Sequence, residues 1–358
     1  MGSIKILHTA DLHLASSFRG LPRHIGQQRR RDFMQTLARL TDICRNQHID
    51  LLLIAGDLWD QENITRPLVD FVADQFSKIP ATKVIIAPGR SDCKYEEGFY
   101  FNYSWPENVH IFSAEMTSLT CPHLNLRIYG KAWAASESAT PDWSRLAADS
   151  ADGSQMLILA HGNPDSLLIP EWIMNLDNLI YIALGGEHRN TVWGEKAYDP
   201  GCPEPSDFSD PSVCGVLKGT IGETCAVEMI PTNSRQFHQL EISVDQCKGL
   251  EECVEVIEKE LATFEPNRNL FALRLTGTRP QGEWDINKLQ QMLNAYYVRL
   301  RDDTEIYYDV TALEAEHNRG VLGKYISAVK SVDCDEQVKK QALALGLDAL
   351  LAGRVAPW

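Results

Sequence analysis

The sequence predicts an α/β fold in which buried parallel strands alternate with helices and end in polar side chains. The clearest strand is residues 51–55, where five apolar residues precede Gly56 and the carboxylate of Asp57. A strand that is apolar at every position is buried on both faces, as in the parallel sheets of α/β proteins. Four other predicted strands also end in polar residues suited to binding a metal. Open α/β sheets bind their ligands at this edge.

Strand and helix patterns alternate along the first half of the chain. The segments that read as buried strands are residues 4–8, 51–55, 83–87, 156–160 and 179–184. After an arginine-rich loop, one helix buries a stripe at helical spacing, formed by Phe33, Leu37, Leu40 and Cys44. A second helix begins at Pro67 and buries Leu68, Phe71, Val72 and Phe76. This order predicts a layered α/β core.

The second half of the chain has a different composition. Residues 194–222 are rich in Gly, Pro, Ser and Asp, which predicts loops and turns. Beyond them we expect strands at residues 237–244, 270–275 and 305–310. The helices between these strands are marked by Leu250, Val254, Ile257 and Leu261, and by Ile286, Leu289, Leu293 and Leu300. The sequence therefore predicts a first domain (1–235), a small α+β domain (236–312) and a C-terminal helical segment (313–358).

Composition narrows the class of protein. The chain has 358 residues, of which 44% are hydrophobic and 23% charged, as in ordinary globular proteins. No apolar run approaches the ~18 residues that span a bilayer, and no secretory signal is visible, so no membrane partner is expected. The nine cysteines form no Cys-x-x-Cys pair, which indicates reduced thiols of a cytoplasmic protein.

The sequence contains a basic cluster and an aromatic cluster, and each has two possible roles. The formal net charge of −15 argues against nonspecific binding of nucleic acid. A local basic cluster nevertheless lies at Arg19, Arg23, His24, Arg29, Arg30 and Arg31. It is either a phosphate contact or a solvated helix start with its preceding loop. The aromatic residues 99–105 either stack on bases or pack under a loop.

The polar residues at the strand ends suggest a metal site. They are Asp11, His13, Asp57, the segment around Arg90, His161 and His188. Carboxylates and imidazoles suit Mn²⁺, Fe²⁺ or Zn²⁺. Asp57, which follows the central strand, is the natural bridge between two cations of the kind that assist phosphoryl displacement. A single histidine is more often structural, but the recurrence at several strand ends favours metal binding.

The same motifs resemble the signature blocks of calcineurin-like metallophosphoesterases. The matching blocks are Thr9-Ala-Asp-Leu-His13, Gly56-Asp-Leu-Trp-Asp60, His161-Gly162 and the turn 185–188. Further short motifs, including Asp199-Pro-Gly-Cys-Pro203, resemble those of the SbcD and YhaO branch of DNA repair exonucleases. The resemblance implies a layered β-sandwich core flanked by helices, a capping domain and C-terminal helices.

The resemblance also implies roles for individual residues. The family's first metal would use Asp11, His13, Asp57 and His188, all of which are present. The second would use Asp57 and His161 together with an Asn and a His, but this chain has Arg90 and Gly186 at those two positions. The family's catalytic His is Ser91 here, and only Asp92 remains from the end of that block.

These departures predict a degenerate catalytic site. A guanidinium stays protonated and repels a nearby divalent cation, although it can hold a phosphate through two hydrogen bonds. We therefore expect one divalent ion, Mn²⁺ before Fe²⁺ or Zn²⁺, with Arg90 in the space of the second cation and with Arg90 and Asp92 as the remaining catalytic residues. Loss of a general acid typically slows a reaction by ~10²–10⁴.

Three functions remain open on this evidence. The first is a weakened metal-dependent phosphodiesterase that acts on DNA ends in repair. The second is a catalytically inactive DNA-binding or scaffolding subunit. The third, a small-molecule phosphatase, is disfavoured by the predicted capping domain. The C-terminal helices resemble a segment that docks on a coiled-coil ATPase of the SbcC or YhaN type, although they could equally pack on their own domain. A homodimer is a further expected partner.

Overall fold

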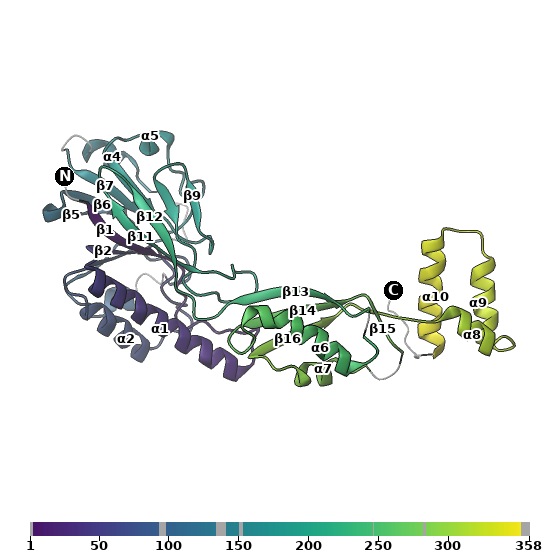
Figure 1. The fold of residues 1–358 in the computed structure, drawn as a ribbon. Coiled ribbons are helices and arrows are strands. Elements are labelled where there is room, and N and C mark those ends of the chain that lie inside the picture. The colour runs from purple at the N-terminus through teal and green to yellow at the C-terminus, as the bar shows by residue number, and fades with distance from the viewer. Residues whose placement is uncertain are drawn as a thin grey trace. The chain divides into compact units, whose positions relative to one another are not determined.

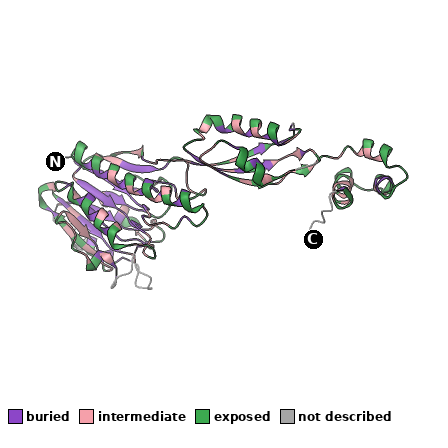
Figure 2. Cartoon of the chain, turned by 90° about the horizontal axis from the view of Figure 1, so that it is seen from below, coloured by how far each residue is buried: buried purple, intermediate pink, exposed green. Residues whose placement is uncertain are grey.

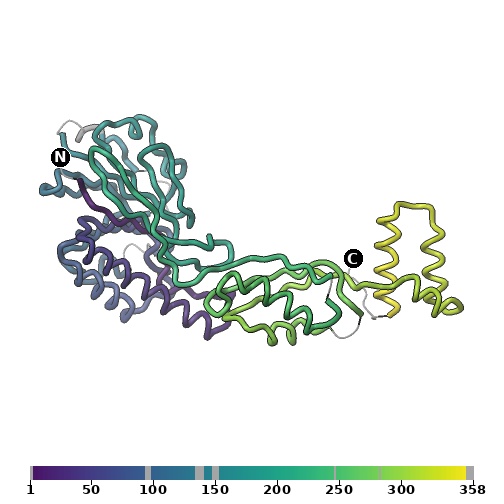
Figure 3. The backbone as a smooth tube through the Cα atoms, viewed as in Figure 1, coloured from purple at the N-terminus to yellow at the C-terminus, as the bar shows by residue number. Residues whose placement is uncertain are grey.

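The computed structural model describes residues 3–92, 98–133, 141–149, 153–245, 247–281 and 284–351. The chain forms two compact units, Met1–Phe237 and His238–Trp358. Figure 1 shows the order of their elements, and Figure 3 traces the same chain as a tube. No helix in the described ranges is long and apolar enough to cross a membrane.

The first unit contains two six-stranded sheets. The first sheet has the order β12-β11-β1-β2-β3-β4. Its strands are β1 (Ile4–Thr9), β2 (Leu51–Ile54), β3 (Lys83–Ile86), β4 (Val109–Ile111), β11 (Gly215–Ile221) and β12 (Ala226–Pro231). Strands β1 to β4 pair in parallel, whereas β11 is antiparallel to both β1 and β12. Because β1, β2 and β3 are parallel, their carboxyl ends lie at one edge of the sheet.

The second sheet has the order β5-β6-β7-β8-β10-β9. Its strands are β5 (Thr117–Cys121), β6 (Leu126–Gly130), β7 (Gln155–Leu159), β8 (Leu179–Ala183), β9 (Thr191–Trp193) and β10 (Ala197–Asp199). Strands β6, β7, β8 and β10 are parallel, so the segments that follow β7 and β8 also leave from one edge.

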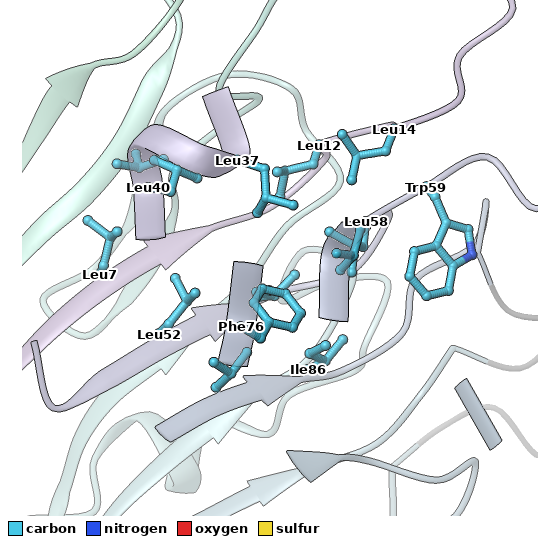
Figure 4. Packing of buried hydrophobic residues seen from close by; sticks show 14 of the residues in the cluster. Leu7, Leu12, Leu14, Leu37, Leu40, Leu52, Leu58, Trp59, Phe76 and Ile86 are labelled. Carbon is cyan, nitrogen blue, oxygen red and sulfur yellow. The ribbon is translucent and has the colours of Figure 1, made fainter. Parts of the chain in front are cut away.

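The two sheets stack face to face between layers of helices. Residues from both sheets, such as Leu53, Ile85 and Leu157, share one buried cluster. The outer face of the first sheet packs against α1 (Arg23–Gln47) and α2 (Arg66–Ser77), which contribute Leu37, Leu40 and Phe76 to the core in Figure 4. The short helices α4 (Ser144–Asp149) and α5 (Glu171–Met174) lie on the second sheet. Figure 2 shows the buried strands inside exposed helix faces. The predicted layered α/β sandwich is confirmed.

The second unit begins with a three-stranded sheet of order β13-β14-β16. Its elements are β13 (Phe237–Ser243), α6 (Leu250–Leu261), β14 (Leu270–Thr276), α7 (Ile286–Met292) and β16 (Tyr297–Asp302), with a small ribbon of β15 (Thr278–Arg279) and β17 (Glu305–Ile306). Helices α6 and α7 bury Ile257 and Leu289 with Phe271 of the sheet. Three helices follow: α8 (Val310–Glu316), α9 (Val321–Ser331) and α10 (Glu336–Leu351).

Several predicted elements need correction. Leu300 was expected in a helix, but it lies in β16, where it pairs with Leu273 of β14. The predicted strand 305–310 covers only β17, because α8 begins at Val310. Residues 194–222 are not all loop, since β11 pairs on both sides there. Pairing within a sheet overrides local composition at Leu300 and in β11. The basic residues from Arg23 onward belong to α1 rather than to a loop.

The aromatic residues 99–105 pack against the core of the first unit. Residues Phe99–Asn102 form the short helix α3. The ring of Tyr100 stacks on Trp59 with ring centres 4.2 Å apart, and Trp105 is nearly parallel to Trp59. Trp59 and Tyr100 are buried in the core beneath α1 and α2. This arrangement favours packing under a loop over base stacking.

A buried histidine joins the two sheets. His8 of β1 is fully buried, and its Nε2 donates to the carbonyl oxygen of Leu184 at 3.0 Å. Its Nδ1 then accepts the hydroxyl of Tyr181 at 3.0 Å, an arrangement that requires a neutral ring. Burial lowers the pKa of His8 to about 3.

We expect His8 to make the protein less stable as the pH falls. The unfolded chain binds a proton at His8 near pH 6.5 and the folded chain only near pH 3, so lower pH favours unfolding. In His8→Gln this dependence is absent, so wild type loses about 2 kcal/mol more than the variant between pH 7 and pH 5. Urea unfolding at both pH values measures this difference, and the exposed His123→Gln serves as control. Parallel losses in wild type and His8→Gln would contradict the expectation.

Candidate metal centre

The loops that follow β1 and β2 run side by side. The amide of Asp11 donates to the carbonyl of Gly56 at 3.1 Å, and the amide of His13 donates to the carbonyl of Asp57 at 2.9 Å. The amide of Asp60 returns a hydrogen bond to Leu14 at 2.9 Å. This pairing holds Asp11, His13 and Asp57 in fixed positions beyond the sheet edge.

The backbone at these positions is strained. Asp11, His13, Asp57 and His188 have φ angles of 51°, 42°, 50° and 56°. The left-handed region is unfavourable for residues that carry a Cβ atom, and such strain gathers at functional sites. The surrounding loop contacts therefore maintain a conformation that these residues do not prefer by themselves.

The loops of the two sheets also meet closely. A Cβ atom at Gly185, which follows β8, would collide with Ala55 and Ala10 of the first sheet. A Cβ atom at Gly89 would collide with Asp57 and with the ring of His161. These contacts require glycine and bring His161 and His188 to the side chains that follow β1 and β2.

Asp11, His13 and His188 form one group of potential ligand atoms. The Nε2 atoms of His13 and His188 face each other at 3.2 Å. Nε2 of His13 lies 3.7 Å from Oδ2 of Asp57, and Nε2 of His188 lies 4.0 Å from Oδ1 of Asp11. Oδ1 of Asp11 is buried and has no hydrogen-bond partner among the described residues.

Carboxylates on the far side of each ring determine which nitrogen carries the proton. Nδ1 of His13 donates to Asp60 at 2.7 Å, and Nδ1 of His188 donates to Asp210 at 3.0 Å. In the neutral rings each Nε2 atom therefore carries a lone pair and no proton, and the two lone pairs point at each other. Such an approach is unfavourable unless a proton or a cation lies between the lone pairs. Together with the unpaired oxygen of Asp11, this geometry fits a divalent cation.

His161 joins a second group with Asp11 and Asp57. Its Nε2 lies 3.6 Å from Oδ2 of Asp57, and its Nδ1 donates to the carbonyl of Ala55 at 2.9 Å. His161 is therefore oriented like the other two histidines, with Nε2 toward the carboxylates.

The negative charges of the cluster favour protonation of its histidines or binding of a cation. Hydrogen bonding to Asp210, assisted by the charge of Asp11, raises the pKa of His188 to about 9. Burial lowers the pKa of His13 and of His161, but the neighbouring carboxylates outweigh it and leave both pKa values raised. Burial raises the pKa of Asp11. The cluster therefore favours protons or a cation between its side chains.

The residues that the sequence places at a second cation position lie differently from the sequence-based expectation. The amide and hydroxyl of Ser91 donate to the two oxygens of Asp57 at 2.7 and 2.9 Å. The side chain of Arg90 is exposed and makes no ion pair with any described residue. Gly186 lies beside His161, where an added Cβ would be 3.4 Å from its Nε2. The structure thus places Ser91, not Arg90, against Asp57.

Asp92 lies below the cluster in a structural network. It is fully buried and accepts hydrogen bonds from the amides of Leu58 and Gly89 and from the hydroxyl of Tyr100. Burial raises its pKa to about 6. These contacts fix the loop that carries Ser91 and give Asp92 a positioning role in this structure.

A cleft opens beside the cluster. It has a volume of about 560 Å³ and is lined by Ser17, Arg19, Asp60, Gln61, Glu62, Asn63, Arg90 and Ser91. Arg90 therefore faces the space next to the candidate metal centre rather than its interior.

Sequence reasoning gave no role to Asp60 or Asp210, which orient the two facing histidines. Asp60 could have been identified from the sequence, because it follows Asp57 by three residues within the motif Gly56-Asp-Leu-Trp-Asp60. No sequence pattern identifies Asp210, since it lies in a segment whose composition predicts only loops and turns. Hydrogen bonds from His188 and Ser206 outweigh the effect of burial and lower the pKa of Asp210 to about 2.

We expect Asp210→Ala to weaken cation binding by ~10–100-fold, the usual effect of losing an outer partner of a metal-binding histidine. Without Asp210, His188 can turn or place its proton on Nε2. Titration calorimetry with Mn²⁺ measures the change. Asp207→Ala in the same loop is the control, because its carboxylate accepts hydrogen bonds from Ser209 rather than from a candidate ligand. Equal affinities of the two variants would contradict this role.

A family model and two curated proteins match the sequence of this chain. The model of the calcineurin-like phosphoesterase family matches residues 4–190. An uncharacterised metallophosphoesterase, YhaO of Bacillus subtilis, is 31% identical over 114 residues, which cover 31% of this chain and 28% of that protein. The DNA double-strand break repair protein Mre11 of Saccharolobus solfataricus is 22% identical over 200 residues, which cover 53% of this chain and 50% of that protein.

The chain therefore spans half or less of the length of the curated relatives that it matches. Among solved structures, a dimetal phosphatase from Danio rerio aligns with a TM-score of 0.37 and 11% identity, covering 64% of this chain and 99% of that one.

Proposed function

Because this chain belongs to the calcineurin-like phosphoesterase family, we propose that it is a metal-dependent phosphodiesterase that acts on DNA ends in the cytoplasm. Two observations support the substrate class. One relative is named as a DNA double-strand break repair protein, and the cleft beside the cluster carries Arg19 and Arg90 as cationic side chains. Guanidinium groups hold phosphates through paired hydrogen bonds.

One observation carries the metal-dependent part of the proposal: the facing Nε2 atoms of His13 and His188, 3.2 Å apart. Asp11, His13, Asp57 and His188 would hold one divalent cation, and we propose Mn²⁺. A cation there supplies Lewis acidity toward a phosphoryl oxygen.

The residues of the chain do the positioning. Asp60 and Asp210 keep the Nε2 atoms of His13 and His188 turned inward. Arg90, at the wall of the cleft, would bind a phosphate oxygen of the substrate and orient it toward the cluster. Ser91 holds Asp57 through two hydrogen bonds and cannot act as the acid that an imidazole would supply. We therefore propose a slow enzyme with a weakened second cation position.

The test is hydrolysis of end-labelled single- and double-stranded DNA by the purified chain with Mn²⁺. Cleavage should stop on chelation and should be absent in Asp57→Asn. Equal background from both proteins would refute the enzymatic proposal.

A second candidate is a catalytically inactive DNA-binding or scaffolding subunit. It is favoured by Ser91, which occupies both oxygens of Asp57, and by Gly186, which offers no side chain beside His161. The combined variant Arg90→Asn, Ser91→His and Gly186→His would then gain hydrolysis that the natural chain lacks. The φ of 112° at Gly186 makes that third change strained, so the first two are also tested together. Hydrolysis by the natural chain at least as fast as by the variants would reject this candidate.

The C-terminal helices are the proposed contact for a coiled-coil ATPase of the SbcC or YhaN type. Helices α9 and α10 bury Leu322, Ile326 and Leu347 together. They also leave apolar side chains exposed, namely Val321, Val338, Leu345, Leu350 and Leu351. Exposed apolar groups of this kind suit an apolar partner surface. Leu345→Glu should abolish copurification with such an ATPase, and unchanged copurification would reject this contact.

A further inference from the structure

Two buried thiols lie in contact at the base of the loop that orients His188. Sγ of Cys202 and Sγ of Cys214 are 3.3 Å apart, and the residues are 2% and 3% exposed. The backbones are already adjacent, because the amide of Gly215 donates to the carbonyl of Cys202 at 3.1 Å. A disulfide needs a sulfur separation of about 2.05 Å, so the two atoms must approach by only about 1.2 Å.

The segment between these cysteines carries the partner of a candidate ligand. Asp210 lies in it and accepts the Nδ1 proton of His188. Sγ of Cys202 itself lies 3.5 Å from the carbonyl of His188, and Sγ of Cys214 lies 3.1 Å from the carbonyl of Pro211. A bond between the sulfurs would tie together the two ends of the loop that holds Asp210.

We propose that Cys202 and Cys214 form a dithiol–disulfide site whose oxidant is a low-molecular-weight disulfide. One cysteine, as thiolate, attacks the small disulfide, forms a mixed disulfide and releases one small thiol. The second cysteine attacks the protein-side sulfur of that mixed disulfide, closes the protein disulfide and releases the second small thiol. The two thiol hydrogens of the protein thus end on the two small thiols, and the small disulfide is reduced by two electrons.

Burial determines how this exchange proceeds. Both thiols are covered in the closed loop, so the first attack requires the outer part of the loop, residues 206–213, to open, while Glu204 stays in its ion pair with Arg29. That part is exposed at Asp207, Ser209 and Val213, and the sulfur contacts of Cys202 and Cys214 lie at the two ends of the loop. Once formed, the bond is covered again, so it exchanges slowly and holds the loop closed.

Two measurable consequences follow. The link joins residues twelve positions apart, restricts the unfolded chain and should raise the melting temperature by roughly 5–10 °C. By keeping Asp210 on His188, it should also slow the loss of Mn²⁺ to a chelator. This second consequence rests on the proposed function, whereas formation of the bond does not.

The experiment uses the full chain, reduced and then equilibrated with oxidised glutathione. Free thiols are blocked with iodoacetamide, and a non-reduced digest is analysed by mass spectrometry. We expect a linked Cys202–Cys214 peptide and the rise in melting temperature, both absent in Cys202→Ser and in Cys214→Ser. Cys225→Ser, which removes an exposed thiol, should behave like wild type.

Glutathione found only as mixed disulfides at other cysteines, with no linked peptide even in mild urea, would overturn the proposal. DNA hydrolysis by the reduced protein is measured in parallel. A linked peptide without hydrolysis would refute the proposed enzyme alone, and hydrolysis without a linked peptide would refute the disulfide site alone.

Discussion

Asp57→Asn is expected to abolish tight cation binding and, with it, any metal-dependent hydrolysis. Asp57 is 5% exposed, and its Oδ2 lies within 3.7 Å of Nε2 of both His13 and His161. The amide replacement keeps the shape but removes a negative charge that lies beside His13 of one group and His161 of the other. The loss of affinity for Mn²⁺ should exceed the ~10–100-fold that follows from losing an outer partner.

The folded structure should survive this substitution. The remaining oxygen of an asparagine can still accept the amide of Ser91, and the hydroxyl of Ser91 can rotate to accept from the new amide group. We therefore expect the melting temperature without metal to stay close to that of wild type, whereas the rise on adding Mn²⁺ disappears.

Titration calorimetry and thermal unfolding with and without Mn²⁺ measure both effects. Asp165→Asn is a matched control, because Asp165 is an exposed carboxylate in the loop that follows β7. Undiminished Mn²⁺ binding by Asp57→Asn would show that the cation does not bind at this cluster.

Arg29→Ala is expected to cause the largest loss of stability, about 3–5 kcal/mol. Arg29 of α1 is fully buried and makes ion pairs of 2.8 Å with Asp32 and with Glu204. Its guanidinium also lies over the rings of Phe33 and Phe237. Removing it leaves buried carboxylates without this partner and opens a cavity between α1 and the segment around Glu204.

Urea unfolding of the full chain measures this loss. Arg45→Ala provides the control on the same helix, because Arg45 pairs with Asp42 at the surface, and such pairs contribute at most about 1 kcal/mol. If both variants lost equally little stability, the buried ion-pair network would not stabilise the fold as we infer.

The burial of Arg29 also bears on the basic cluster at residues 19–31. Sequence reasoning grouped six basic residues there as a candidate phosphate contact. Arg29 faces the interior and cannot serve that role, whereas Arg19 lines the cleft near Arg90. Charge density along the sequence could not separate them, because Glu204, the partner that draws Arg29 inward, lies 175 residues away.

The α/β fold was predictable because its signals are local. Residues 51–55 are apolar without interruption, and β2 lies in the interior of its sheet with all four of its residues buried. Where local signals were weak, prediction failed: β11 contains two glycines and a lysine, yet it pairs with strands on both sides.

The sequence by itself determined that Asp11, His13, Asp57, His161 and His188 would follow strands of one α/β core, since strand ends are local features and parallel strands share an edge. Only the tertiary structure decided how these side chains are oriented, and that Ser91 rather than Arg90 contacts Asp57. Those outcomes depend on contacts between distant segments, such as the hydrogen bond from the amide of Gly186 to Asp11 and the close approach of His13 to His188, which no local pattern encodes.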